Sequence, residues 1–276
     1  MIGSTGNKKI KQLAGWQKKR KQRDADSVFV VEGLRMFEEA PRQMVEAVYV
    51  SESFFKQKKE ELKLKESWGE KLEILTDTVF DYVSDTRTPQ GVLLVMRKMH
   101  YKAEDIILSG KLQKVSGKTP LLMVLENLQD PGNLGTILRA GEAAGVTGIL
   151  MSKDCADIYN PKVVRSTMGS IFRIPFSHVE DVPETVKELE KNGIRTYAAY
   201  LEGGGSYERE NYLPGSAFVI GNEGNGLKED TLAAVKHYVK IPMLGKVESL
   251  NAAMAATVLM FEAARQRRNN RKDTHL

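Results

Sequence analysis

The C-terminal half of the chain shows the clearest pattern of apolar and polar positions. Short apolar runs typical of buried strands lie at Leu121 to Asn127, at TGILMS, at Thr196 to Tyr200, at Ala217 to Ile220 and, more briefly, at Tyr238 to Pro242. Helical stretches separate them: Asn133 to Ala144, a segment beginning at Asn160-Pro161, Val182 to Asn192, and Lys228 to Lys236. This alternation predicts an α/β domain with a mainly parallel sheet covered by helices.

The last predicted element is a helix from Leu250 to Arg267. Its apolar residues recur at steps of three and four, which indicates an amphipathic helix with one buried face. The helix is also rich in alanine, and small side chains allow another helix to approach closely.

The N-terminal half is more polar, and its apolar runs VFVVEG, AVYVS and VLLVM predict three short strands in a small α/β domain. A polar stretch, KLQKVSGKTP, is typical of a linker. The expected organisation is a basic N-terminal arm (1–28), a small α/β domain (29–98), a linker (99–119) and a larger domain (120–270). A chain of 276 residues is long enough for two hydrophobic cores.

Charge is distributed unevenly and favours a polyanionic partner. The formal net charge is +5. No acidic residue occurs before Asp24, whereas the same segment contains Lys8, Lys9, Lys11, Lys18, Lys19, Arg20, Lys21 and Arg23. A solvated basic helix without a partner would show the same charges, but a second basic group from Arg265 to Lys272 favours nucleic acid.

Several classes of protein are not expected. No apolar run approaches the length of a membrane span and no signal peptide is visible, so the expected location is the cytoplasm. The single cysteine, Cys155, cannot form an internal disulfide and is not expected to be catalytic. His100, His178, His237 and His275 are scattered without metal-ligand spacing, so we expect no metal.

Three stretches rich in glycine and asparagine follow predicted strands, where open parallel sheets usually bind ligands. They are NLQDPGNLGTILRAGEAAG, VIGNEGNGL and IPMLGKVESLNAAMA. The middle stretch lacks the lysine of a P-loop and the spacing of a dinucleotide-binding fingerprint. Gly221, Gly224 and Gly226 are compatible both with a tight turn and with close approach of a ligand.

Together, in this order, the three stretches resemble the signature motifs of the SpoU (TrmH) family of the SPOUT superfamily over residues 120–268. The segment from Phe29 to Met96, with VVEG and TPQGVLLVM, is similar to the small RNA-binding domain that precedes the catalytic domain in many members. The resemblance implies a trefoil knot, S-adenosylmethionine as cofactor and a homodimer. It also implies methylation of a ribose 2′-hydroxyl in structured RNA, with ribosomal RNA favoured over transfer RNA.

The resemblance also implies which residues form the site. The catalytic set would be Arg139, Asn133, Glu223, Ser249 and Asn251, and the cofactor would contact Gly221, Ile241, Leu250 and Leu201. A guanidinium holds its proton too tightly for a general base, so we expect Arg139 to clamp phosphate near the helix start. Ser249 could cap the last helix, contact substrate, or both, and Glu223 could serve only as an acceptor for backbone amides.

A further stretch, NPKVVRSTMGS, resembles a family segment that contacts RNA or the dimer partner. Its residues Asn160, Arg165, Ser166 and Gly169 are therefore additional candidates.

Two alternatives to an RNA methyltransferase remain open. One is a catalytically silent RNA-binding or ribosome-assembly protein of the same fold, which would have no chemical reason to retain Arg139, Glu223, Ser249 and Asn251 together. The other is an unrelated nucleotide-binding α/β enzyme, and the missing phosphate-loop lysine argues against it.

Overall fold

A computed structural model describes residues 1–108, 119–200 and 202–273. The chain forms two compact units, each assembled from two stretches of sequence. Unit 1 comprises Met1–Met99 and Asp157–Phe172, and unit 2 comprises His100–Ala156 and Arg173–Leu276. The second stretch of unit 1 lies inside the range 120–270 that the sequence pattern assigns to the larger domain.

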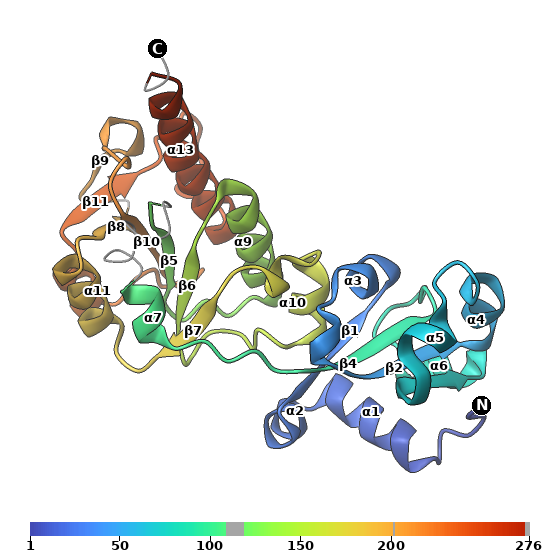
Figure 1. Cartoon of the computed structure of the whole chain (residues 1–276). Helices are drawn as coiled ribbons and strands as arrows, with labels where there is room; N and C mark the ends of the chain where they lie inside the picture. Colours follow the sequence, from blue (N-terminus) through green and yellow to red (C-terminus); the bar gives the residue numbers. More distant parts are fainter. Residues whose placement is uncertain (109–118, 201, 274–276) are drawn as a thin grey trace. The chain divides into compact units, whose positions relative to one another are not determined.

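Unit 1 contains a four-stranded sheet in the order β1-β4-β2-β3 (Figure 1). The strands are β1 Val28–Glu32, β2 Val45–Ser51, β3 Leu72–Leu75 and β4 Val92–Arg97. The helices of unit 1 are α1 Lys8–Lys18, α2 Arg20–Asp26, α3 Leu34–Glu39, α4 Glu52–Lys58, α5 Leu64–Trp68, α6 Asp77–Val83 and α10 Pro161–Ser166, with single 3-10 turns at Arg42–Met44, Gly69–Lys71 and Ser170–Phe172. Strand β4 runs antiparallel to both neighbours, and only β2 and β3 are parallel.

The first 28 residues fold as part of unit 1 and do not form a separate arm. Ile10 and Leu13 of α1 are fully buried in the core of this unit, together with Phe80 and Val83 of α6. The basic residues hide this pattern in the sequence, because few apolar positions interrupt them. Arg23 is itself buried and pairs with Asp157 at 2.5 Å.

The segment Asp157–Phe172 is attached to unit 1 by aromatic and polar contacts. The ring of Tyr159 packs against Phe29 of β1 with 4.7 Å between centroids, and its hydroxyl donates to the carbonyl of Met99. Arg165 pairs with Asp85 at 3.0 Å. Asn160 and Ser166, from the segment that resembles an RNA- or dimer-contacting one, make local bonds: Asn160 caps α10, and Ser166 donates to the carbonyl of Val163.

Unit 2 is built on a seven-stranded sheet in the order β7-β6-β5-β10-β8-β11-β9, and every neighbouring pair is parallel (Figure 1). The strands are β5 Leu121–Leu125, β6 Gly148–Ser152, β7 Phe176–Val179, β8 Arg195–Ala199, β9 Gly205–Ser206, β10 Ser216–Ile220 and β11 His237–Lys240. The predicted parallel sheet covered by helices is therefore confirmed. The trefoil knot stays a prediction.

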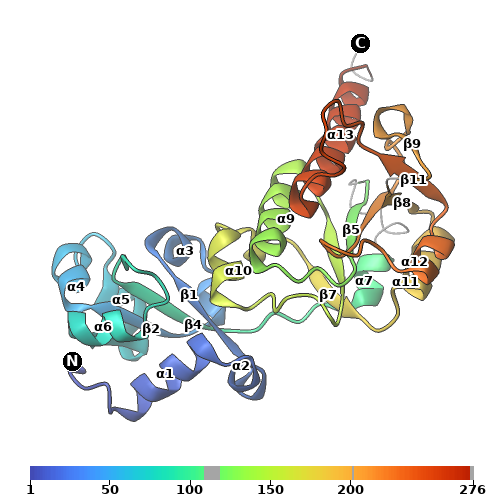
Figure 2. The same cartoon turned by 180° about the vertical axis from the view of Figure 1, so that it is seen from behind.

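Helices cover both faces of this sheet. They are α7 Ala103–Ile107, α9 Pro131–Ala144, α11 Val182–Lys191, α12 Glu229–Ala234 and α13 Ala252–Asp273, with a 3-10 turn at Tyr207–Arg209. Helices α9 and α13 lie together on one face, and α7 and α11 on the other (Figure 2). Ile106 and Ile107, within the expected linker, form α7 and are buried in the unit 2 core. Residues 109–118 of that linker lie outside the described residues.

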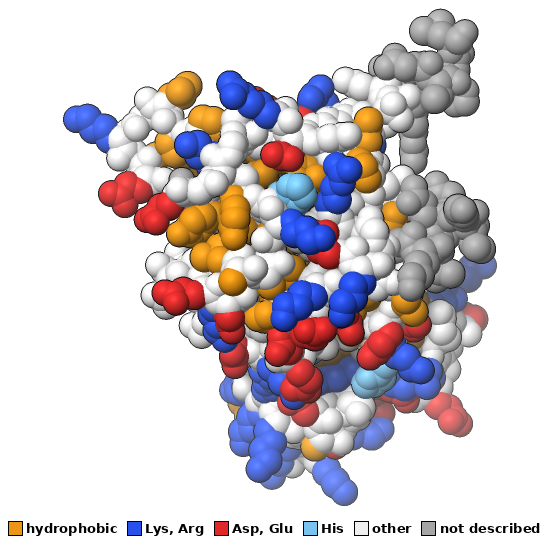
Figure 3. All heavy atoms as spheres, turned by 90° about the vertical axis from the view of Figure 1, so that its left-hand side faces the viewer, with side chains coloured by type: hydrophobic (Ala, Val, Ile, Leu, Met, Phe, Trp, Pro, Cys, Tyr) orange, Lys and Arg blue, Asp and Glu red, His pale blue; other side chains and the backbone are white. Residues whose placement is uncertain are grey.

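The short strands β3 and β7 are not anticipated by the sequence pattern, because LEIL and FSHV are too short or too polar to stand out. On the face that carries α11 and β11, hydrophobic side chains gather and charged ones of both signs surround them (Figure 3). No helix among the described residues is long and apolar enough to cross a membrane.

Because α1 is part of the unit 1 core, Leu13→Ala should lower the free energy of unfolding by about 2–5 kcal/mol, the usual cost of emptying a buried leucine site. Urea unfolding followed by tryptophan fluorescence measures this directly, since Trp16 and Trp68 both lie in unit 1. The neighbouring exposed position supplies the control, Gln12→Ala, with an expected effect within about 0.5 kcal/mol. Equal, negligible effects of both substitutions would mean that α1 is not docked.

Candidate active site

The carboxyl ends of the parallel strands in unit 2 carry a pocket with a volume of about 440 Å³. It lies at the ends of β8, β10 and β11 and before the start of α13. Among the residues that line it are the predicted site residues Gly221, Glu223, Ile241, Ser249 and Leu250. The volume is within the range of about 300–1,000 Å³ that small-molecule sites occupy.

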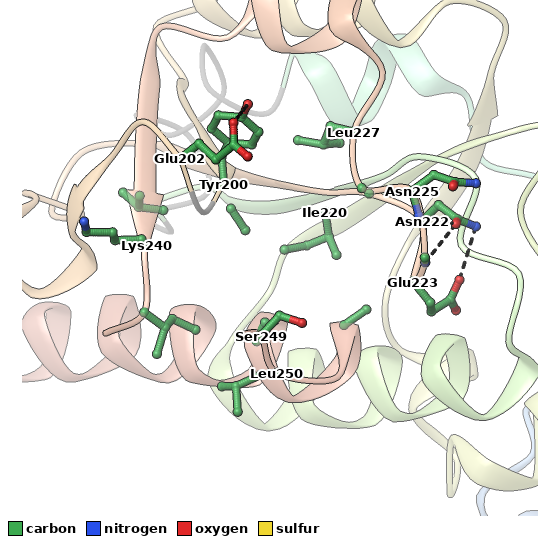
Figure 4. A pocket seen from close by; sticks show the side chains of 18 of the residues that line it. Tyr200, Glu202, Ile220, Asn222, Glu223, Asn225, Leu227, Lys240, Ser249 and Leu250 are labelled. Carbon is green, nitrogen blue, oxygen red and sulfur yellow. Dashed lines mark hydrogen bonds between the residues drawn. The ribbon is translucent and has the colours of Figure 1, made fainter. Parts of the chain in front are cut away.

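The pocket has three sides that differ in chemistry (Figure 4). Tyr200 and Glu202 lie together on one side, and Ser249 and Leu250 lie opposite them. The turn with Asn222, Glu223 and Asn225 forms a third, polar side, and the side chain of Ile220 lies between these groups. An apolar ring with polar groups at its ends would fit this lining.

The turn after β10 folds tightly on itself. Asn222 and Gly226 exchange two backbone hydrogen bonds of 2.9 and 3.0 Å, and the side chain of Asn222 accepts from the amides of Gly224 and Asn225. Gly226 has a φ of +67°, which favours glycine. A Cβ at Gly221 would come within 2.2 Å of the Gly226 carbonyl carbon, so Gly221 is required by the turn itself.

Glu223 joins this turn to the loop that begins α9. One carboxylate oxygen accepts from the amide of Asp130 at 2.9 Å and from the side chain of Asn133 at 3.0 Å. The other accepts from the amide of Gln129 at 3.1 Å and, more weakly, from Asn222 at 3.4 Å. These bonds use the acceptor positions of the carboxylate and place a negative charge at the N-terminus of α9, where the helix dipole stabilises it.

Partial burial by itself would raise the pKa of Glu223. The hydrogen bonds from the Asn133 side chain and from the amides of Asp130 and Gln129 outweigh burial, and the pKa is lowered from its ordinary value of 4.5. Glu223 is therefore a carboxylate at neutral pH and acts as an acceptor.

Asn133 continues the chain of bonds to α13. Its side-chain oxygen accepts from the side chain of Asn251 at 2.9 Å. The oxygen of Asn251 in turn accepts from the amides of Ala253 and Met254, so Asn251 is the cap of α13. The possibility that Ser249 caps this helix is therefore wrong. Ser249 lines the pocket and makes no hydrogen bond within the described part of the chain.

Arg139 is placed apart from this network. It is exposed on α9, about 9 Å along the axis from Asn133 and about 120° around it, and it has no ion-pair partner among the described residues. At the start of α9 the side chain of Asp130 accepts from the amide of Asn133 at 2.9 Å, so this amide is already bonded within the chain. Leu201 lies outside the described residues.

Some residues of the pocket were not anticipated from the sequence. Tyr200 and Glu202 flank position 201, and the Tyr200 hydroxyl donates to Glu202 at 3.3 Å. The charge of Glu202 raises the pKa of Tyr200, so the phenol stays protonated. Directly after β5, the buried carboxylate of Glu126 accepts from the amide of Lys228 at 2.8 Å and the hydroxyl of Thr231 at 2.7 Å. Tyr200 and Glu126 each follow a strand directly, and this position is the feature of the sequence that could have indicated them.

Cys155 is buried beneath the end of β5. Burial raises the pKa of its thiol, which donates to the carbonyl of Leu125. Within residues 1–108, 119–200 and 202–273, no three His, Cys, Asp or Glu side chains meet in a way that could hold a metal ion.

Comparison with known proteins assigns the family. Residues 120–261, which contain the whole pocket, match the model of the SpoU rRNA Methylase family. The chain belongs to the SpoU family of RNA methyltransferases. Residues 7–94 match the model of the MRM3-like substrate binding domain, a range that includes α1.

The chain resembles individual family members over nearly its full length. It is 30% identical over 266 residues to a 23S rRNA (guanosine(2553)-2′-O)-methyltransferase of Bacillus subtilis, covering 94% of this chain and 97% of that protein. It is similar to the crystal structure of an AdoMet-bound rRNA methyltransferase from Sinorhizobium meliloti, with a TM-score of 0.82 and 25% identity over 96% and 97% of the two chains. The SpoU methyltransferase AviRb from Streptomyces viridochromogenes gives a TM-score of 0.81 at 25% identity, with 96% and 99% covered.

The Glu223 network predicts a specific dependence of stability on pH. Because the folded-state pKa is lowered, the bonds to Glu223 stabilise the fold above the unfolded-state pKa of about 4.3, and this contribution is lost as pH falls through the folded-state pKa. The difference in unfolding free energy between the wild type and Glu223→Gln should therefore shrink as the pH is lowered below about 4.3. Chemical denaturation at a series of pH values measures it.

The matched control is Glu188→Gln, since the Glu188 carboxylate accepts no hydrogen bond within the described residues. The same pH-dependent loss in both variants would assign the effect to net charge and contradict a role for the hydrogen bonds.

Proposed function

We propose that this chain transfers the methyl group of S-adenosylmethionine to a ribose 2′-hydroxyl of structured RNA, with ribosomal RNA preferred over transfer RNA. The observation that carries the proposal is the bonded series Glu223–Asn133–Asn251 beside the pocket. It joins the three motif segments of the family at one place. The names of the relatives support the ribose position and ribosomal RNA.

The pocket fits the proposed cofactor by its chemistry. Ile220, Leu227 and Ile241 offer an apolar surface for an adenine ring, and Glu202 and Glu223 place negative charge near a cation. S-adenosylmethionine, when bound, supplies an electrophilic methyl group on a positively charged sulfur. Gly221, Ile241 and Leu250, to which the family resemblance assigns cofactor contacts, line the pocket.

Because the Glu223 carboxylate already accepts four hydrogen bonds, it is better suited to fix the loops around the pocket than to accept a proton from the substrate. The Asn133 side chain is likewise bonded to Glu223 and Asn251, and the oxygen of Asn251 accepts from backbone amides of α13. Two groups remain available for RNA. The Ser249 hydroxyl lies in the pocket, where it can orient the ribose, and the Arg139 guanidinium is exposed, where it can hold a phosphate beside the attacking hydroxyl.

A weak nucleophile such as a ribose hydroxyl gains most from this kind of positioning. Bringing it in line behind the methyl carbon turns a bimolecular reaction into a unimolecular one. The silent RNA-binding alternative provides no such role for Ser249 and Arg139. Transfer RNA remains the alternative substrate, and it is distinguished by assaying both RNAs.

Arg139→Ala should lower the single-turnover rate of methyl transfer by at least about a hundredfold, because a positioned charge is removed from the transition state. Its affinity for S-adenosylmethionine should change little, since Arg139 does not line the pocket. Arg139→Lys should not restore the rate, because an ammonium lacks the planar fork. Radiolabelled methyl transfer under saturating enzyme and calorimetric titration of the cofactor measure the two effects.

A near-wild-type rate for Arg139→Ala would contradict the placement of catalysis beside α9. Absence of any cofactor binding by the wild type would remove the enzyme itself from consideration.

We also propose that the chain forms a homodimer, but not through the alanines of α13. The alanines of α13 are used within the chain, because Ala253, Ala256 and Ala263 are buried and the helix packs on α9. The exposed side of α13 instead carries Met254 (55% exposed) and Phe261 (41% exposed), seven residues apart on one stripe. A second copy would bury this stripe.

Light scattering at micromolar concentration should give a mass close to twice 30.9 kDa. Met254→Glu with Phe261→Glu should shift the protein to monomer without unfolding it, since both side chains face solvent. A monomeric wild type would contradict the dimer.

A further inference from the structure

Helix α1 is fixed to unit 1 by its apolar side, so its lysines occupy set positions. Lys11 and Lys18 are seven residues apart, which places them about 10 Å apart along one edge of the helix. Lys9 lies on the opposite edge and is neutralised by Glu73 of β3. Among the described residues, Lys11 has no ion-pair partner.

An exposed aromatic residue borders this edge of α1. Tyr82 of α6 is 49% exposed, which is unusual for a residue of its size, and the Lys18 ammonium lies 5.7 Å from the centroid of its ring. Helix α6 carries two acidic residues: Asp77 lies about 140° around the helix from Tyr82 and bonds to Ser53 of α4, and exposed Asp81 lies about 100° around it. One edge of α1 thus places two exposed lysines beside an exposed aromatic ring.

The surroundings are strongly basic. Helices α1 and α2 form the lowest part of the view in Figure 3, as they do in Figure 1. Lysine and arginine side chains predominate in this part. Lys19 and Lys21, in and before α2, are exposed and have no ion-pair partner within the described chain. This charge suits a polyanion, and the aromatic ring suits a planar base.

We propose that Tyr82, Lys11 and Lys18 form a platform for an unpaired nucleotide of the substrate RNA, whose base stacks on the Tyr82 ring while the lysines hold the flanking phosphates. The proposal rests on RNA being the substrate. Single-stranded segments expose base faces to aromatic side chains, whereas a duplex hides them in its stack. The Tyr82 platform therefore selects unpaired RNA over duplex RNA.

Unit 1 contains a matched pair that should not bind RNA. The Lys65 ammonium also lies 5.7 Å from an aromatic centroid, that of Phe55. This second pair lies on α4 and α5, and Phe55 is less exposed than Tyr82, so its ring offers a base less surface for stacking. Lys65→Ala and Phe55→Ala are thus controls for removing a cation or a ring without removing the platform.

The test uses the full-length protein and two fluorescein-labelled probes, a 12-nucleotide oligouridylate and a 12-base-pair RNA duplex, followed by anisotropy at several salt concentrations. Tyr82→Ala should weaken oligouridylate binding roughly tenfold and leave duplex binding unchanged, because only the stacked base is lost. Tyr82→Phe should bind as the wild type does. Lys11→Ala with Lys18→Ala should weaken both probes and flatten the salt dependence by about two counterions.

Equal effects of Tyr82→Ala and Phe55→Ala, or failure of the wild type to bind oligouridylate at low salt, would overturn the platform; the latter would leave a protein partner as the occupant of this surface. Melting curves of each variant show that it is folded. Methyl transfer separates this proposal from the proposed function. A wild type that methylates RNA while Tyr82→Ala binds normally refutes the platform alone. A wild type that methylates no RNA while Tyr82→Ala loses oligouridylate binding refutes the enzyme alone.

Discussion

The site depends on one carboxylate that holds three distant segments together. Glu223 belongs to the turn after β10, yet it bonds to the loop before α9 and, through Asn133, to the cap of α13. These segments are about 90 and 118 residues apart in the chain. A parallel sheet brings their ends to one edge, but only hydrogen bonds of this kind fix the loops relative to each other. With its acceptor positions taken, Glu223 organises the site, and Ser249 and Arg139 are the residues for which we propose RNA contacts.

Unit 1 is also held together by contacts between segments that are far apart in the sequence. The acidic residue Asp157 and the ring of Tyr159, both from a segment that follows β6 of unit 2, complete the packing around Arg23 and Phe29. The N-terminal helix, which charge alone would describe as a loose arm, is anchored by Ile10 and Leu13. Its basic residues are consequently presented on a folded surface, where neighbouring residues such as Tyr82 can act with them.

Much of unit 2 could be predicted from sequence because its signals are local. Apolar runs such as Leu121 to Leu125 mark buried parallel strands, and Gly145 ends α9 in the left-handed conformation that glycine favours. The candidate residues Gly221, Glu223, Ile241, Ser249 and Leu250 were identified through motif resemblance, and the structure places them around one pocket. Their roles remain proposals, as do the knot and the dimer.

Features that depend on long-range contacts could not be predicted. Nothing local indicates that Asp157 would pair with Arg23 across 134 positions, or that α1 would join a core. Ser249 and Asn251 are both of the residue types that cap helices, and only the geometry shows that Asn251 is the cap. The role of Glu126 cannot be predicted from local sequence, because its partners Lys228 and Thr231 lie more than 100 positions away.

The central claim is that Glu223 acts on catalysis through Asn133 and Asn251. A double-mutant cycle of Glu223→Gln and Asn251→Ala, read as the single-turnover rate of methyl transfer to RNA, measures their coupling directly. If both residues hold the same arrangement, the double variant should be little slower than the worse single variant, with a coupling energy of at least about 1 kcal/mol. Rate losses that simply add would show that the two residues act independently and would contradict the account.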